Sequence, residues 1–201
     1  MFTSISTTVL VLLGVLAGVV SRVTAEDIAQ THTKGVQIKN RGEVRLTVDM
    51  TEEDRFQLPP GQVASIILKD TWSGTISAQP TNCKADTCDG APHTTAHIQF
   101  GGEKGKDRYY ISLEEGFNLP MKIQPTGQNN FCKSSTCLED ILEHCPEDQR
   151  IKDDNGDTTA CKWDVDLFRN YCPHVVITKE DPNHSNAVTC SSSNTYMVLI
   201  G

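Results

Sequence analysis

Eight cysteines are the residues of this 201-residue sequence that offer the most definite chemistry. Their number is even, and no two of them have the two-residue spacing of a zinc ribbon, so disulfides are favoured over a metal site. Disulfides form in oxidising compartments, which predicts four bridges in a secreted protein. The residues alone leave the pairing open. The cysteines are Cys83, Cys88, Cys132, Cys137, Cys145, Cys161, Cys172 and Cys190.

Other groups that could do chemistry are better explained as turns or strands. The run from Asp153 to Asp157 resembles a calcium-binding loop, but its glycine precedes the third aspartate and no glutamate follows at the required place. His93 and His97 lie in a strand-like setting, where they should not converge on a metal. The sequence has no Gly-x-Ser-x-Gly motif of a serine hydrolase. We therefore expect neither a metal ion nor a cofactor.

The first residues are typical of a secretory signal. An apolar run from Val9 to Val20 is followed by the small-residue cleavage site Val23-Thr24-Ala25. This predicts a signal peptide over residues 1–25 and a mature domain over residues 26–201. The apolar run is too short to span a bilayer, so stable membrane insertion is not expected. Asn183-His184-Ser185 is a glycosylation sequon, and we expect Asn183 to be an acceptor in a secreted, extracellular protein.

The charge of the mature chain limits its partners. Removing the predicted signal peptide takes away one of 18 Lys and Arg residues and none of the 26 Asp and Glu residues, so the net charge is 17 − 26 = −9. An acidic surface repels phosphate backbones, which argues against a nucleic-acid partner. The remaining 201 − 25 = 176 residues suit a single domain, and we expect a monomer.

Alternating apolar and polar residues predict many short strands. The clearest is Tyr109–Leu113, where Tyr109, Ile111 and Leu113 would face one way and Tyr110 the other. Val36 and Ile38 precede an Asn-Arg-Gly turn and a second alternating run, which predicts a hairpin. Many short strands separated by turns favour an antiparallel β-sandwich. The other expected strands are Val63–Leu68, Trp72–Ala78, Ala96–Phe100, Met121–Ile123, Val175–Ile177 and Tyr196–Ile200.

Residues 132–172 follow a different pattern from the strands around them. Thr136 and Glu139 fit a capping box, which predicts a short helix ending before Pro146. Val165 and Phe168 recur at helical spacing and predict a second helix. We expect this segment to form a small disulfide-stapled helical flank on the sandwich.

Three features of the sequence resemble a known family. Gly116-Phe117-Asn118-Leu119-Pro120-Met121 is similar to the GFNLPM signature of thaumatin-like, osmotin-type pathogenesis-related proteins. The cysteine order that follows it, and Phe168-Arg169-Asn170-Tyr171-Cys172-Pro173, also resemble that family. The resemblance covers roughly residues 36–201, with a shortened middle. It implies a thaumatin-like sandwich in a reduced, small-type member.

The resemblance implies one disulfide pairing. The pairs are Cys83–Cys88, Cys132–Cys190, Cys137–Cys172 and Cys145–Cys161. A further bridge of the family has no counterpart here, because its two positions fall on Gly42 and Gly201. We expect these two glycines to be neighbours even without a bridge.

The resemblance also implies an acidic cleft between the sandwich and the flank, associated with one Arg, one Glu and three Asp. In this chain the Arg position falls near Ala91, the Glu position on Gln99 or on Ile98, and the first Asp position on Tyr110. The two remaining Asp positions match Glu115 and Glu180. An aromatic ring in the cleft would favour sugar binding, because sugar faces stack on rings. The cleft candidates are Glu115, Glu180, Asp181, Tyr110, Gln99 and Phe117.

Glu115 and Glu180 admit three interpretations. A glycosidase needs one carboxyl as acid and another as base or nucleophile, and this pair could serve. Both residues also belong to acidic doublets, which are common on solvated surfaces, and both could line a charged ligand cleft. We expect no catalytic residue, because the positions on Ala91, Gln99 and Tyr110 have lost their charged groups.

Three functions follow from the resemblance. The first is a secreted defence or antifungal protein that binds a cell-wall polysaccharide such as β-1,3-glucan. The second is an extracellular protein-interaction module, either an enzyme inhibitor or an effector, on the same scaffold. The third is a weak β-1,3-glucanase. An exposed apolar patch away from the cleft would favour the second function.

Overall fold

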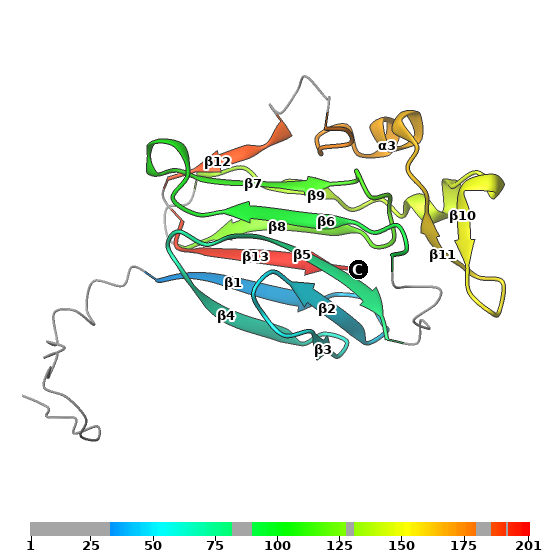
Figure 1. Ribbon diagram of the computed structural model, residues 1–201, viewed down its shortest axis with the longest axis horizontal. Helices are drawn as coiled ribbons and strands as arrows, with labels where there is room; N and C mark the ends of the chain where they lie inside the picture. The colour runs from blue at the N-terminus through cyan, green and yellow to red at the C-terminus, as the bar shows by residue number, and fades with distance from the viewer. Residues whose placement is uncertain (1–32, 82–89, 128–130, 180–185, 192) are drawn as a thin grey trace, which may run out of the picture. The chain divides into compact units, whose positions relative to one another are not determined.

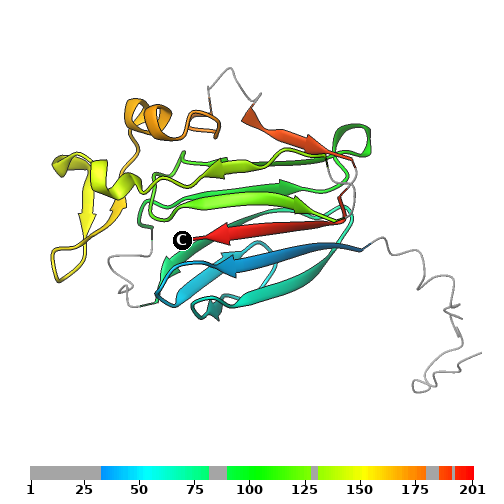
Figure 2. The same cartoon turned by 180° about the vertical axis from the view of Figure 1, so that it is seen from behind.

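The computed structural model describes residues 33–81, 90–127, 131–179, 186–191 and 193–201. Two β-sheets lie face to face (Figures 1 and 2) and confirm the predicted mainly-β sandwich. The predicted signal peptide lies outside the described residues, as do Cys83, Cys88, Glu180, Asp181 and Asn183.

The two sheets contain five and six strands. The five-stranded sheet has the order β4 (Val63–Lys69), β1 (Thr33–Asn40), β13 (Thr195–Ile200), β8 (Met121–Thr126) and β9 (Ser135–Cys137). The six-stranded sheet has the order β12 (Val188–Cys190), β7 (Asp107–Ser112), β6 (Thr95–Gln99), β5 (Ser73–Pro80), β2 (Leu46–Met50) and β3 (Phe56–Leu58). Neighbouring strands of both sheets are antiparallel apart from β1 and β13, which pair in parallel.

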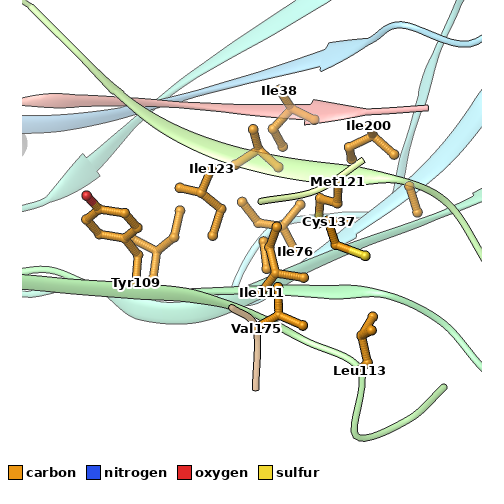
Figure 3. Packing of buried hydrophobic residues seen from close by; sticks show 14 of the residues in the cluster. Ile38, Ile76, Tyr109, Ile111, Leu113, Met121, Ile123, Cys137, Val175 and Ile200 are labelled. Carbon is orange, nitrogen blue, oxygen red and sulfur yellow. The ribbon is translucent and has the colours of Figure 1, made fainter. Parts of the chain in front are cut away.

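The core lies between the two sheets, where the predicted alternation places it. Tyr109 and Ile111 of β7 point inward from one sheet and meet Ile123 of β8 and Ile38 of β1 from the other (Figure 3). Each of these side chains is fully buried. Full burial of one such side chain contributes about 1.5–3 kcal/mol, so this layer drives the association of the two sheets.

The predicted hairpin between residues 36 and 48 is wrong. β1 pairs with β4 and β13, whereas β2 pairs with β3 and β5 in the opposite sheet. Alternation marks a buried face in either arrangement and does not select the partner strand. The Asn40 side chain stabilises the crossing, because its amide donates to the carbonyls of Val44 (2.7 Å) and Leu58 (2.9 Å). Its Oδ1 accepts from the Gly42 N–H at 2.9 Å.

A small flank follows β9 and gathers at one end of the sandwich (Figure 1). Its elements are η2 (Ile141–His144), η3 (Glu147–Gln149), β10 (Arg150–Lys152), β11 (Thr158–Cys161) and α3 (Val165–Tyr171). Three disulfides hold it: Cys132–Cys190, Cys137–Cys172 and Cys145–Cys161. These are three of the four pairs that the family resemblance implies, and the fourth, Cys83–Cys88, lies outside the described residues. The remaining described helix, η1 (Glu103–Gly105), precedes β7.

Of the two helices predicted in the flank, one begins where expected. Asp164 caps α3 by accepting from the N–H groups of Asp166 and Leu167. The capping box at Thr136 is wrong, because Ser135–Cys137 is strand β9 and pairs with β8. The helical turn there is the 3₁₀ element η2, capped by Asp140. Pairing of this segment with the edge of β8, together with the disulfide at Cys137, outweighs the local preference of Thr136 to cap a helix.

The GFNLPM corner joins the sandwich to the flank. Gly116 has φ = 97°, and a Cβ there would lie 2.5 Å from the Cβ of Pro92 and 2.6 Å from the Cys161 oxygen. Phe117 exchanges backbone hydrogen bonds with Cys161, at 3.0 and 2.7 Å. The buried Asn118 accepts from the Thr94 N–H and donates to the Ala78 carbonyl. Each of these residues therefore has a structural role.

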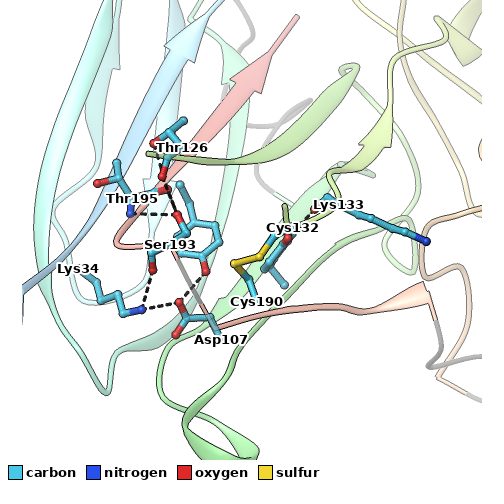
Figure 4. The surroundings of a disulfide bond; sticks show 10 residues. Lys34, Asp107, Thr126, Cys132, Lys133, Cys190, Ser193 and Thr195 are labelled. Atoms are coloured by element: carbon cyan, nitrogen blue, oxygen red, sulfur yellow. Dashed lines mark hydrogen bonds and ion pairs between the residues drawn. A yellow bond between two sulfur atoms is a disulfide. The ribbon is translucent and has the colours of Figure 1, made fainter. Parts of the chain in front are cut away.

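A buried carboxylate connects three strands and a turn (Figure 4). Asp107 of β7, which is 1% exposed, accepts at Oδ2 from Lys34 Nζ and from the Tyr196 hydroxyl, both at 2.6 Å. Its Oδ1 accepts from the Gly101 N–H at 3.0 Å. Lys34 also donates to the Ser193 carbonyl at 2.8 Å. The carboxylate thus links β1, β7, β13 and the turn before β7.

Gly42 and Gly201 are neighbours, as expected. A Cβ on Gly201 would lie 2.7 Å from the Gly42 nitrogen and 3.0 Å from its Cα. Gly201 has φ = 89°, which L side chains rarely adopt. A cysteine pair placed at these two positions would therefore have to change this backbone conformation before a bridge could close.

Replacement of Asp107 should destabilise the fold strongly. We expect Asp107→Ala to lower the free energy of unfolding by about 3–5 kcal/mol, because it leaves the Lys34 ammonium and the Tyr196 hydroxyl without their partner. Tyr196→Phe removes one hydrogen bond and should cost about 1–2 kcal/mol. Urea denaturation with the disulfides intact measures both. Equal losses in the two variants would contradict a central role for the carboxylate.

Candidate functional site

The outer face of the six-stranded sheet carries a cluster of polar and aromatic side chains. On β7, Arg108 and Tyr110 alternate with buried residues and therefore point away from the core. On β6, Gln99 lies opposite Arg108, and His97 lies opposite Tyr110. These four side chains line an open depression of about 160 Å³, together with Ser73 and Thr75 of β5. We call these six residues the outer-face site.

A stack of three side chains forms the centre of the outer-face site. The His97 and Tyr110 rings lie 4.6 Å apart between centroids and 8° from parallel. The Arg108 guanidinium lies 5.3 Å from the centre of the Tyr110 ring, within range of a cation–π contact. Aromatic pairs and cation–π contacts each contribute about 0.5–1.5 kcal/mol, so the three side chains hold one another in place.

Burial and two nearby charges shift the pKa values of both rings. Burial lowers the pKa of His97 from 6.5; the Glu114 carboxylate opposes this shift and the Arg108 charge adds to it. Burial raises the pKa of Tyr110, and Arg108 and Glu114 act on it in opposite directions. At neutral pH both rings are therefore uncharged. The positive charge at the outer-face site belongs to Arg108.

The structure brings some of the predicted cleft residues together and separates others. Tyr110 and Gln99 lie on neighbouring strands in the outer-face site. Glu115 is exposed beyond the end of β7, and its carbonyl accepts from the His93 N–H at 3.1 Å. Phe117 is fully buried in the core and cannot offer a ring to a ligand, so its prediction as a cleft residue is wrong. Gly116 turns the chain before Phe117, so the strand alternation does not extend to it.

The carboxylates next to the site are not arranged as a catalytic pair. Glu114 accepts at Oε2 from the Ser112 hydroxyl at 3.1 Å, and its N–H donates to the same hydroxyl oxygen at 3.2 Å. Glu115 is exposed to solvent. In the described part of the chain, no group of three His, Cys, Asp or Glu residues could hold a metal ion. The site offers hydrogen-bond donors, a guanidinium and ring edges, which suit binding.

Sequence reasoning missed three residues. Alternation along each strand could have shown that His97 and Arg108 point away from the core, as Tyr110 does. The contact between His97 and Tyr110, however, depends on the register between β6 and β7. Trp163 in the flank is 48% exposed, and its indole N–H donates to the Ile177 carbonyl at 2.8 Å. Ile177 follows Val176, which pairs with Ser112 at the end of β7. Trp163 therefore lies at the junction of flank and sheet, and no sequence pattern indicated this.

No helix of the described residues is long and apolar enough to cross a membrane.

Comparison with known proteins gives a consistent set of similarities. The model of the thaumatin family matches residues 42–167. Thaumatin-like protein 1 of Prunus persica is 33% identical over 128 residues, which cover 53% of this chain and 52% of that protein. Pathogenesis-related protein 5 of Arabidopsis thaliana is 31% identical over 137 residues, covering 58% and 56%. A glucan endo-1,3-beta-glucosidase of Prunus avium is 26% identical over 144 residues, covering 69% and 56%. The chain thus spans about half the length of these relatives.

The shifted pKa of His97 provides a test of the stack. An NMR titration of the His97 ring should give a midpoint below 6.5. Glu114→Gln should lower this midpoint further and Arg108→Gln should raise it, because each removes a charge that acts on the ring.

The same shift has a consequence for stability. The imidazole pKa is lower in the folded state than in the unfolded state, so stability is fully present above pH 6.5 and is lost as the pH falls from 6.5 to the lowered value. A His97 midpoint at or above 6.5 would contradict the burial of the imidazole in the outer-face site.

Proposed function

Because the chain belongs to the thaumatin family, we propose that it is a secreted, defence-type protein that binds a cell-wall polysaccharide such as β-1,3-glucan without hydrolysing it. The polysaccharide lies along the outer-face site and the adjoining flank. Two relatives support this proposal, because one is a pathogenesis-related protein and the other is a glucan endo-1,3-beta-glucosidase. The three disulfides agree with an oxidising, extracellular compartment.

The observation that carries the non-hydrolytic assignment is the pair of residues at two of the implied acidic positions. Tyr110 stands at one and is stacked on His97, and Gln99 stands at the other. A glycosidase needs one carboxyl enclosed in an apolar or like-charged setting, so that it stays protonated, and a second that is ionised. Glu115 is exposed to solvent instead. The described part of the site therefore supports binding better than acid–base chemistry.

Trp163 supplies an aromatic surface that a sugar could use. Its indole is half-exposed and is fixed by the hydrogen bond to the Ile177 carbonyl. Nearby, Cys161 is bridged to Cys145, and its backbone pairs with Phe117. A large ring that is already fixed loses little conformational freedom when it stacks on a ligand. We therefore assign the stacking role to Trp163 in place of Phe117.

A pull-down with insoluble β-1,3-glucan, with cellulose and chitin as controls, tests this function. We expect wild type to bind the glucan, Trp163→Ala to bind about threefold to tenfold more weakly, and Glu115→Gln to bind almost unchanged. Phe131→Ala, which removes a 92% exposed aromatic ring elsewhere, is the matched control and should bind as wild type. Release of reducing sugar from laminarin that Glu115→Gln abolishes would show that the protein is a hydrolase.

A second function, that of a protein-interaction module, is favoured by one observation. Within the described strands β4 is paired only with β1, and Val63 (46% exposed) and Ile67 (77% exposed) lie on the face of this edge strand that points away from the core. An apolar sheet edge of this kind is suited to pairing with another protein. This edge belongs to the five-stranded sheet, opposite to the sheet that carries the outer-face site.

An inhibition assay distinguishes the second function from the first. If the protein inhibits secreted glycoside hydrolases through β4, Val63→Lys with Ile67→Lys should abolish inhibition while glucan binding persists. Because both side chains are exposed, the double variant should unfold at nearly the wild-type urea concentration. Inhibition that survives the double variant would exclude β4 as the interaction surface.

A further inference from the structure

We propose that the Arg108 end of the outer-face site binds the carboxylate of an acidic saccharide, one that contains uronic acid, in preference to a neutral glucan. This inference rests on the proposed saccharide-binding function and specifies its ligand. It follows from four features of the described residues: the available donors of Arg108, the covered face of Tyr110, the neighbours of Arg108, and the distribution of charge along β7.

Arg108 has donors that the protein does not use. Its side chain is half-buried, and its one recorded contact is with the Tyr110 ring. Among the ion pairs and side-chain hydrogen bonds of the described residues, none involves the Arg108 guanidinium. A guanidinium presents five N–H donors in a flat fork that matches the two oxygens of a carboxylate. The structure therefore offers a complete donor set for one anionic group.

The stack determines which part of a ligand can be recognised. One face of Tyr110 lies against His97, and the Arg108 guanidinium lies over the ring. A sugar cannot stack on the face of Tyr110 that His97 covers without displacing the imidazole. At this end, a ligand is therefore recognised by the Arg108 guanidinium and by the polar side chains beside it. The stack also holds Arg108 in place, which reduces the entropy lost when the guanidinium engages an anion.

The neighbours of Arg108 suit the hydroxyl groups of a sugar. Gln99 is exposed directly opposite Arg108, and Ser73 is exposed opposite Gln99 on the next strand. A primary amide donates and accepts, as a hydroxyl does, so both groups can bind the hydroxyls around a ring carboxylate. Lys106 is exposed two residues before Arg108 and adds a second positive charge near this end of β7.

The acidic character of the whole chain does not prevent this binding. The formal net charge is −8, but charges further apart than about 8 Å are largely screened at physiological ionic strength. The Glu114 carboxylate also acts on the His97 and Tyr110 rings, but it lies beyond the end of β7, and its Oε2 accepts a hydrogen bond from the Ser112 hydroxyl. The two positions of the site where the resemblance implies carboxylates hold Gln99 and Tyr110, so Arg108 has no acid there to neutralise it.

The test compares short saccharides that differ in charge. Tetragalacturonate, its fully methyl-esterified form and a neutral β-1,3-linked tetrasaccharide are titrated by calorimetry at pH 7 and two salt concentrations. We expect tetragalacturonate to bind about tenfold more tightly than its methyl ester, and the difference to shrink at high salt. Arg108→Gln should remove the difference, and Arg108→Lys should retain part of it, because lysine keeps the charge but loses the fork.

Two controls separate recognition from net charge and from folding. Lys122→Gln removes the same charge from β8 of the other sheet and should leave every affinity unchanged. Thermal unfolding of each variant checks that the fold is intact. If Arg108 had a purely structural role, its replacement would lower the melting temperature without changing the preference for the acid over its ester.

The outcomes distinguish this inference from the proposed function. If the ester and the neutral glucan bind as tightly as the acid, the inference is overturned and saccharide binding stands. If none of the three saccharides binds, the proposed function fails and the inference with it. If tetraglutamate competes as well as tetragalacturonate, the site accepts any carboxylate, and its assignment to an acidic saccharide is overturned.

Discussion

The buried carboxylate of Asp107 is the interaction on which the rest of the structure depends. It accepts hydrogen bonds from the Lys34 ammonium, the Tyr196 hydroxyl and the Gly101 N–H, and so joins the two sheets at one end of the core. A buried charge is tolerated only when it is paired and fully hydrogen-bonded, which fixes the relative position of β1, β7 and β13. Because side chains alternate along β7, an inward Asp107 and Tyr109 require Arg108 and Tyr110 to point outward. The network in the core thereby determines which residues the outer-face site contains.

Disulfides stabilise the flank, whereas buried apolar side chains stabilise the sandwich. Few side chains of the flank are fully buried, among them Ile141 and Phe168, so apolar burial there is limited. The bridges close separations of 58, 35 and 16 residues, and loop-closure arithmetic gives each about 3–4 kcal/mol. The backbone pairing of Phe117 with Cys161 then attaches the flank to the corner that follows β7. Cys161 carries both the disulfide to Cys145 and the backbone pairing with Phe117. Because Trp163 follows only two residues later, these two links hold it beside the sheet.

The sequence predicted the strands better than it predicted their partners. Alternation correctly identified β7, β8 and β13, since a strand with one buried face must show it. It could not show that β1 and β2 lie in different sheets, because a hairpin and a crossing connection bury the same residues. At Thr136 a local capping pattern was outweighed by pairing with β8 and by the bridge at Cys137. Contacts between residues far apart in the sequence decided each of these cases, and a single sequence does not contain them.

The candidate site shows the same limit in its chemistry. Tyr110 and Gln99 were predicted from single positions, whereas the contact of Tyr110 with His97 exists only because β6 and β7 pair in one register. A shift of one residue would turn either ring into the core. Because of that register, Tyr110 has two effects on the site. The tyrosine removes an implied carboxylate and also forms the surface on which Arg108 rests with its donors free. In the proposed function, loss of acid chemistry and gain of a binding group for an anion would thus arise from the same residue, and the site would have changed its ligand.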